Sequence, residues 1–273
     1  MPYLRVMKAD NTLLFDTSKI TYGLLRSGYL VSGDPWYRKK LRSAQLDPSN
    51  GANWTDDTNL PDPQWYFSID NSVSPILFIV GDGCLNGTSV SGNTRTYIFG
   101  NASANTKVYA FDVMRDIGTP PRLRTWLDTG VLTFNSYMPP LNIAFAVQPP
   151  GLGAASGTAV KTTYAGGYNQ TVRSDAPPIQ YSHYQMPLGN EEFAAYLTFS
   201  RTGACVPEAG TSGFSVFEGA GGYVGGVKFM FGPSGGTTST LIGGQFIGYY
   251  SVPVDRMPTA LVIRTANLPF PFG

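Results

Sequence analysis

The chain has 273 residues, of which 42% are hydrophobic and only 14% are charged. This composition predicts a folded protein with an uncharged polar surface and argues against intrinsic disorder. The formal net charge of +1 creates no overall field that would favour nucleic acid or an anionic membrane as a partner.

The sequence has no apolar run of the roughly 20 residues needed to cross a bilayer, and its first residues lack the apolar core of a secretory signal. We therefore expect a soluble protein made in a reducing cytosol, without membrane insertion. Cys84 and Cys205 are far apart in the chain and have no histidine nearby. Two unpaired thiols are our first interpretation and one long-range disulfide is the second.

Residues 4–17 predict a β-hairpin, and residues 123–136 repeat its pattern without a gap. Asn11 and Gly130 take the same place in the two copies, and these residue types enter positive φ most readily in a tight turn. The repeat predicts two related halves, which we place at 1–118 and 119–273. We expect the two hairpins to hold apart the loops in which any recognition takes place. The other matched pairs are Leu4 and Leu123, Arg5 and Arg124, Leu13 and Leu132, Phe15 and Phe134, and Asp16 and Asn135.

The rest of the first half contains several predicted strands and one predicted helix. Asp34 and Pro35 resemble a helix start, so residues 36–46 predict a short helix. Residues 47–64 predict a long polar loop that carries Trp54. The remaining predictions are strands at 19–32, 65–69 and 76–80, turns at 82–83 and 86–87, a hairpin of 95–99 with 107–111, and a linker at 116–121.

The second half contains short strands separated by glycine-rich segments. Residues 151–167 predict a flexible connection, and residues 219–227 predict a turn that enters a strand. A strand is favoured over a helix at 190–201. The other predicted strands are 141–147, 214–217, 227–231, 241–242, 245–250 and 260–264. This regular spacing predicts an all-β protein of antiparallel β-sandwich-like units with little helix.

No motif in the sequence predicts a catalytic, metal or cofactor site. His183 is the only histidine, and a lone histidine between tyrosines is more often a packed or surface aromatic residue. Adjacent carboxylates at 56–57 and 191–192 point to opposite faces of an extended chain, whereas glycoside hydrolysis needs two carboxyl groups facing each other. We therefore expect the protein not to be an enzyme.

Aromatic side chains in polar surroundings are the candidates for contact with a receptor or partner. Tyrosine and tryptophan provide rigid, amphipathic contact area for sugars or proteins, although ordinary anchoring of loops explains them equally well. Phe270 and Phe272 lie in a proline-containing segment that cannot enter a sheet centre, and we expect them to pack on a neighbouring subunit or domain. The contact candidates are Trp54, Tyr164, Tyr168, Tyr181, His183 and Tyr184.

The paired hairpins also support a family resemblance. Residues 3–6 with 13–17, and residues 108–112 with 123–124 and 132–136, carry a short pattern that ends in Leu-x-Phe followed by Asp or Asn and then Ser or Thr. In this pattern the chain resembles the small β-rich tail-tip and tail-fibre-associated proteins of long-tailed bacteriophages. It departs from them at Trp126, where a small β-branched residue is expected, and in its glycine-rich last third.

The resemblance implies a virion structural protein near the host-contacting end of the tail, made in the cytoplasm of the host bacterium. Its expected partners are other phage tail proteins, with a host surface receptor or glycan as a further candidate. Open sheet edges also favour a homo-oligomer, with a trimer among the options. A carbohydrate-binding β-sandwich that uses Trp54 or the segment 181–184 is the alternative, and a surface-polysaccharide depolymerase ranks third.

Overall fold

A computed structural model describes residues 5–7, 9–11, 13–16, 19–43, 45–47, 49–120, 122–156, 159–173, 179–207, 214–233, 239–240 and 246–273. The fold is nearly all β with antiparallel sheets in a sandwich-like arrangement, which confirms the predicted fold class. Within these residues the helical structure is the single 3₁₀ turn η1 (Gly51–Asn53). The predicted strand at 241–242 lies outside the described residues.

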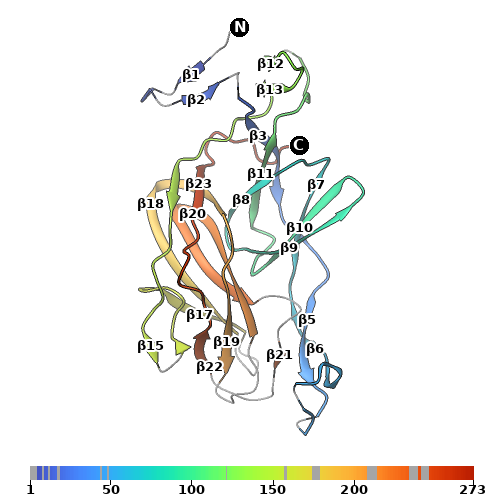
Figure 1. Cartoon of the computed structure of the whole chain (residues 1–273), viewed down its shortest axis with the longest axis vertical. Coiled ribbons are helices and arrows are strands. Elements are labelled where there is room, and N and C mark those ends of the chain that lie inside the picture. The colour runs from blue at the N-terminus through green and yellow to red at the C-terminus, as the bar shows by residue number, and fades with distance from the viewer. Residues whose placement is uncertain are drawn as a thin grey trace.

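The largest sheet has 12 strands and forms the body of the molecule (Figure 1). Nearly all of its strand pairs are antiparallel, and the long strands β18 and β20 run side by side through its centre. It combines strands from both sides of position 118, and the division into two domains stays a prediction. Its strands are β3 (Tyr22–Tyr29), β8 (Ile76–Val80), β11 (Lys107–Val113), β14 (Phe145–Val147), β15 (Ala155–Ser156), β16 (Ala159–Val160), β17 (Tyr168–Arg173), β18 (Ile179–Leu197), β19 (Thr202–Pro207), β20 (Phe214–Pro233), β22 (Phe246–Tyr250) and β23 (Ala260–Arg264).

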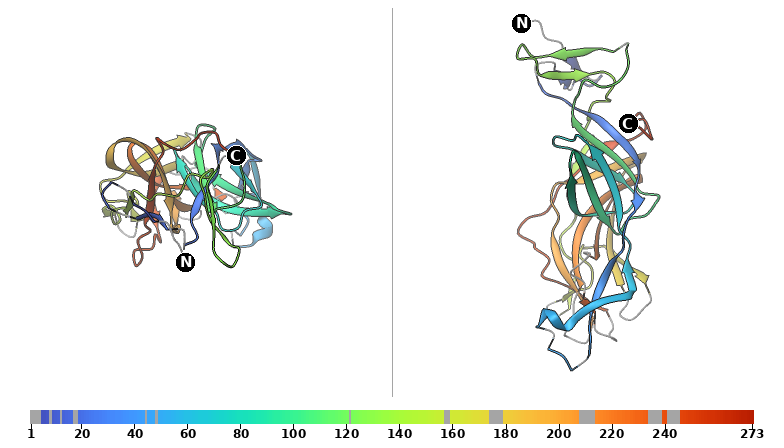
Figure 2. Two further views of the ribbon diagram at one scale, coloured as in Figure 1. Left: turned by 90° about the horizontal axis from the view of Figure 1, so that it is seen from above. Right: turned by 90° about the vertical axis from the view of Figure 1, so that its right-hand side faces the viewer.

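In the part of the chain that the structure describes, four smaller sheets complete the fold. The molecule is elongated, with two two-stranded hairpins at one end and a three-stranded sheet toward the other (Figures 1 and 2). A four-stranded sheet lies beside β8 and β11. Its strands are β4 (Val31–Ser32), β7 (Trp65–Asp70), β9 (Cys84–Ser91) and β10 (Thr94–Gly100). The three-stranded sheet holds β5 (Trp36–Leu41), β6 (Trp54–Asp62) and β21 (Ser239–Thr240), and the hairpins are β1 (Arg5–Met7) with β2 (Leu13–Asp16) and β12 (Arg124–Trp126) with β13 (Leu132–Asn135).

Two main apolar clusters hold these layers together. One joins the four-stranded sheet to β8 and β11 through Phe67, Ile79 and Phe99, all buried. The other packs the face of β18, β20 and β23, including Phe193 and Phe229, against the strands β16 and β22. Burial of apolar area on both sides of the large sheet is the main stabilising term for such an architecture.

The predicted helix at 36–46 is wrong, and the predicted loop at 47–64 is wrong over residues 54–62, which form β6. Residues 36–41 form β5, which pairs antiparallel with β6. Lys39 lies opposite Asp56 and forms an ion pair with it, and Lys40, which lies opposite Thr55, forms an ion pair with the diagonal neighbour Asp57. These charge pairs between β5 and β6 stabilise an extended chain at 36–41, because they form only when both segments are strands. This stabilisation exceeds the local preference of Asp34 and Pro35 for starting a helix.

The predicted hairpin of 95–99 with 107–111 is also wrong. Strand β10 pairs with β7 and β9, whereas β11 pairs with β3 and β8. The connector between β10 and β11 carries the chain from one sheet to the other. The hairpin in the structure is formed by β9 and β10, and its turn lies at residues 92–93, where Gly92 has a φ of 57°. Residues 86–87, which were predicted to form a turn, lie inside β9.

The glycine-rich segment at 219–227 is strand, not turn. It lies inside β20, which runs without interruption from Phe214 to Pro233. A Cβ atom at Gly222 would lie 1.8 Å from the carbonyl oxygen of Phe193, and one at Gly221 would lie 1.9 Å from that of Gly81. These glycines therefore allow neighbouring backbones to approach closely where β8, β18 and β20 meet.

One further predicted strand and one predicted connection can be compared with the structure. The strand favoured at 190–201 is confirmed, because β18 extends to Leu197. The segment at 151–167, predicted as a flexible connection, contains the short strands β15 and β16.

Candidate functional site

The two repeated hairpins have the same geometry. Arg5 pairs with Asp16 in the first, and Arg124 pairs with Asn135 in the second. Each register shifts at the equivalent step, after Val6 and after Thr125. Asn11 has a φ of 63° and Gly130 has a φ of 81°. The predicted turns and the repeat of the hairpin are therefore confirmed.

Both hairpins lie at the same end of the molecule (Figures 1 and 2). The expectation that they hold loops apart is wrong, because they form one shared end, which we call the hairpin end. Met7 and Trp126 take equivalent positions in β1 and β12, and their side chains are 49% and 48% exposed. Leu13 and Leu123 are exposed at this end as well. The hairpin end thus presents large apolar side chains to solvent.

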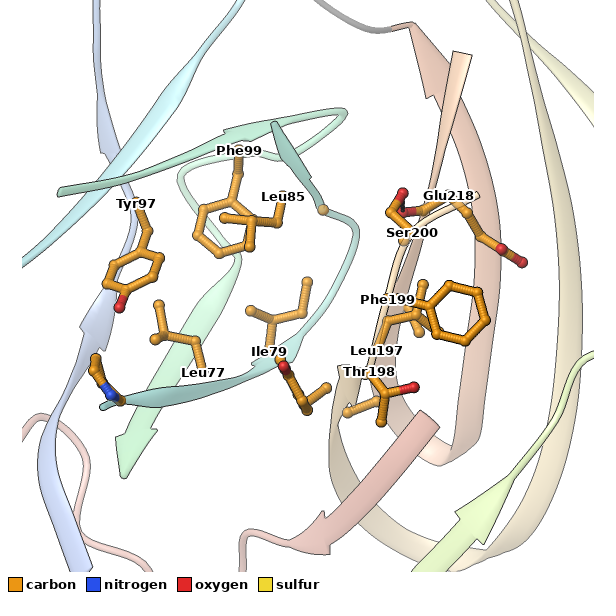
Figure 3. A pocket seen from close by; sticks show the side chains of 16 residues that line it. Leu77, Ile79, Leu85, Tyr97, Phe99, Leu197, Thr198, Phe199, Ser200 and Glu218 are labelled. Carbon is orange, nitrogen blue, oxygen red and sulfur yellow. Dashed lines mark hydrogen bonds between the residues drawn. The ribbon is translucent and has the colours of Figure 1, made fainter. Parts of the chain in front are cut away.

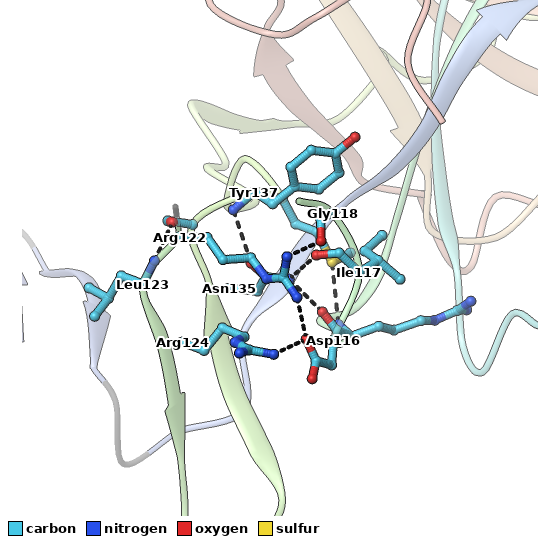
Figure 4. A network of polar contacts seen from close by, with 11 residues as sticks. Asp116, Ile117, Gly118, Arg122, Leu123, Arg124, Asn135 and Tyr137 are labelled. Carbon is cyan, nitrogen blue, oxygen red and sulfur yellow. Dashed lines mark hydrogen bonds and ion pairs between the residues drawn. The ribbon is translucent and has the colours of Figure 1, made fainter. Parts of the chain in front are cut away.

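A polar network fixes the second hairpin to the body (Figure 4). Asp116 forms ion pairs with Arg122, at 3.0 Å, and with Arg124. Hydrogen bonds from Arg124 and then Arg122 lower the pKa of the Asp116 carboxyl group. The buried Asn135 amide donates to the carbonyl oxygens of Arg115, at 2.6 Å, and Ile117, at 2.9 Å.

The first hairpin is braced differently from the second. The buried Asp16 carboxylate accepts a hydrogen bond from Arg5 Nε of the same hairpin at 2.9 Å. From the sequence, residues 116–121 were predicted to be a linker, and the network around Asp116 was not predicted. The sequence feature that could have indicated this network is one acidic residue, Asp116, close to two basic residues, Arg122 and Arg124, at the start of the repeated hairpin.

The predicted aromatic contact residues separate into different environments. Tyr164 is fully buried, and its ring centroid lies 6.3 Å from that of Tyr184 in the main core. Tyr168, which is exposed, and Tyr181 have ring centroids 5.4 and 6.3 Å from that of His183. Trp54 begins β6 in another sheet. The aromatic residues therefore do not form one exposed platform.

His183 is completely buried, and neither ring nitrogen has a hydrogen-bond partner among the described residues. It faces Met230 across β18 and β20. Burial, followed by the nearby positive charge of Lys228, lowers the pKa of His183 to about 4, while Asp82 acts in the opposite direction. The imidazole is therefore neutral near pH 7, and its burial leaves no access for a substrate.

We expect His183 to make the protein less stable as the pH falls from about 6.5 toward 4. The unfolded pKa is near 6.5 and the folded pKa is about 4, so in this window the unfolded chain binds a proton that the folded chain does not. The loss reaches up to about 3 kcal/mol, and this contribution levels off below the folded pKa. Urea unfolding across this range measures it.

The variant His183→Phe keeps an aromatic ring at this buried position and removes the imidazole group that titrates. Carboxylates titrate in both proteins, so the relevant quantity is the difference between their two pH profiles. Equal losses of stability in wild type and variant would show that His183 is not responsible.

A buried ion pair lies deeper in the same body. Arg201 Nε and Nη2 each lie 2.7 Å from an oxygen of the Glu218 carboxylate, and both side chains are at most 2% exposed. The Tyr164 hydroxyl donates to Glu218 Oε1 at 2.8 Å. Burial, followed by the Glu218 charge, raises the pKa of Tyr164 well above its ordinary value, so the phenol remains a donor. The carboxylate is thus fully engaged in structural contacts.

A pocket of about 220 Å³ lies between the four-stranded sheet and the segment at 197–200 (Figure 3). Its walls are mainly apolar and include Leu77, Ile79 and Phe99. The Glu218 carboxylate points away from these side chains (Figure 3) and is bound by Arg201 and Tyr164. The pocket can hold a small apolar group, but it offers no pair of available acid and base groups for catalysis.

Phe270 and Phe272 lie half-buried against other parts of the same chain. The Phe270 ring contacts Tyr29 and Tyr109, with centroids 4.8 and 5.5 Å away. The Phe272 ring lies 5.4 Å from that of Tyr137. A contact of either ring with a second subunit stays a prediction.

Cys84 and Cys205 are both buried and are not joined by a disulfide. Burial raises the pKa of the Cys84 thiol, which disfavours the reactive thiolate. Among the described residues, no group of three or more His, Cys, Asp or Glu side chains could hold a metal ion. The same residues include no helix that is long and apolar enough to cross a membrane.

Comparisons with known proteins give no family model, no curated protein and no solved structure that matches the chain.

Proposed function

We propose that the protein is a non-enzymatic structural component of a bacteriophage tail, located at the tail tip or in a tail fibre. The observation that carries the proposal is the hairpin end, where one hairpin pattern occurs twice with the same register and turn position. This is the pattern on which the resemblance to phage tail proteins rests.

The hairpin end has the properties of an assembly surface. A two-stranded hairpin is marginally stable by itself, and its open edges invite pairing with another chain. Apolar side chains such as Met7 and Trp126 lose contact with water when a partner covers them. We infer that other tail proteins bind this end, and that the opposite end, around β5, β6 and β15, is the one that faces the host (Figure 1).

The carbohydrate-binding alternative gains no support from the aromatic residues. Tyr164 is buried, and Trp54 lies in a different sheet from Tyr181 and Tyr184. Sugar stacking needs exposed rings that lie together, so we do not propose this function.

Co-expression with the neighbouring reading frames of the same genome tests the proposal. The wild-type protein is expected to copurify with tail proteins, and the double variant Met7→Asp, Trp126→Asp is expected to lose them. Val254→Asp is a matched control, because Val254 is exposed outside the hairpin end. A wild-type protein that binds no tail protein, or a double variant that binds as well as wild type, would contradict the proposal.

A further inference from the structure

The β9 edge of the four-stranded sheet differs from three other sheet edges in how it is protected. An exposed edge presents unpaired N–H and C=O groups, and proteins usually cover it, shorten it, or place charges or proline on it. The outer edge of β3 is covered by another segment of the chain. Ser27 and Phe272 exchange backbone hydrogen bonds of 2.8 and 3.1 Å there.

Two further edges are protected by their sequences. At the opposite edge of the four-stranded sheet, β4 has only two residues and is followed by Gly33, Asp34 and Pro35. In the three-stranded sheet, the edge strand β6 carries three aspartates and one proline. Short length, proline and charge all oppose unwanted pairing with another strand.

Strand β9 has none of these protections over residues 88–91, whereas its first residue, Cys84, lies against Gly219 of β20. It is eight residues long, from Cys84 to Ser91, and contains no charged residue and no proline. In the described part of the chain, β10 is its only partner strand. Its hairpin with β10 projects from the side of the molecule (Figures 1 and 2), and Val90 is 65% exposed. A second chain can therefore approach this edge without meeting the body.

The turn of the hairpin defines which backbone groups face outward. Ser91 lies opposite Thr94, on either side of the two-residue turn at 92–93. Residues that flank such a turn exchange their hydrogen bonds with each other, and the pattern alternates along the strand. Ser91 and Ser89 therefore bond to β10, while Thr88 and Val90 direct their N–H and C=O groups to the open edge.

We propose that β9 pairs antiparallel with β9 of a second copy of this chain, about a two-fold axis near residues 88–91. Pairing joins two four-stranded sheets into one continuous sheet. The register shift between Ile98 and Phe99, opposite Leu85 and Gly87, marks where the regular part of the hairpin begins. The contact does not depend on the proposed function.

The charge pattern favours a second copy as the occupant. In a two-fold contact the same short segment faces itself, so a charged residue near the axis would lie close to an identical charge, which destabilises pairing. The segment 84–91 has no charge to create this repulsion. Thr88 and Val90 are β-branched, which suits them to a strand with partners on both edges.

Light scattering coupled to size-exclusion chromatography tests the proposal. The wild-type chain of 29.4 kDa is expected to elute with twice its monomer mass at high micromolar concentration. The variants Thr88→Lys, Val90→Lys and Thr88→Glu, Val90→Glu are each expected to halve that mass, and an equimolar mixture of the two is expected to restore it. Val254→Lys is the matched control, because Val254 is exposed in the segment between β22 and β23.

Amide hydrogen exchange gives a second measurement that needs no variant. On dilution to monomer, the Thr88 and Val90 amides are expected to lose protection at least about tenfold, while Ser89 and Ser91 keep theirs. A wild-type protein that is monomeric at high concentration would overturn the proposal. A dimer that survives in both charged variants, or unchanged protection at Thr88 and Val90, would also overturn it.

Discussion

Replacing Arg201 with alanine is expected to destabilise the protein by roughly 3–5 kcal/mol, because the Glu218 carboxylate would remain buried without its cation. Arg201 makes two hydrogen bonds of 2.7 Å to this carboxylate and one of 3.1 Å to the carbonyl oxygen of Pro253. The Tyr164 hydroxyl alone cannot compensate the charge. Urea unfolding near pH 7 measures the loss.

Two comparisons show whether burial is the cause. Arg264→Ala removes an ion pair with Glu191 in which both side chains are about half exposed, and we expect it to cost less than about 1 kcal/mol. The double variant Arg201→Met, Glu218→Met removes both buried charges and should recover much of the lost stability. Similar losses for Arg201→Ala and Arg264→Ala would contradict the assignment.

Replacing Gly222 with alanine is expected to destabilise the fold by about 3 kcal/mol or more, at the upper end of the range for overpacked sites. The added Cβ would lie 1.8 Å from the Phe193 carbonyl oxygen and 2.7 Å from the Ala194 nitrogen. These are backbone atoms of β18, so relief requires the two central strands to separate. Thermal unfolding monitored by circular dichroism measures the effect.

Gly151→Ala is the matched control, since a Cβ there meets no atom within 4 Å. Removing a glycine from an open position reduces the freedom of the unfolded chain, so this variant should be neutral or slightly stabilising. If Gly222→Ala were tolerated as well as Gly151→Ala, the close approach of β18 and β20 would not limit the residue at this position.

The features predicted from the sequence are those whose signal is local. Asn11 and Gly130 mark turns because a single residue must enter positive φ. The aromatic and β-branched content of the segments that became β7 and β8, and the alternation at the end of β18, are visible within a few residues. The all-β class follows from the same short-range patterns.

The predictions that failed depend on partners that are distant in sequence. Residues 36–41 form a strand because of the aspartates in β6. The glycines of β20 resemble a turn in the local sequence, and only the close approach of the β18 backbone explains why glycine is needed within a strand. The buried contact between Tyr164, Arg201 and Glu218 was missed for the same reason. Nothing in the local sequence distinguishes these three residues from surface residues of the same type.

The contact between Ser27 and the segment near Phe272 has a consequence for how the protein is made. The Ser27 hydroxyl donates to the Pro269 carbonyl oxygen at 2.7 Å, across 242 positions of the chain. During translation, β3 therefore leaves the ribosome long before the residues that cap it have been synthesised. Contacts of such long range slow folding and leave nascent strands open to wrong pairing, so we expect β3 to be the part of the nascent chain that most needs protection by chaperones.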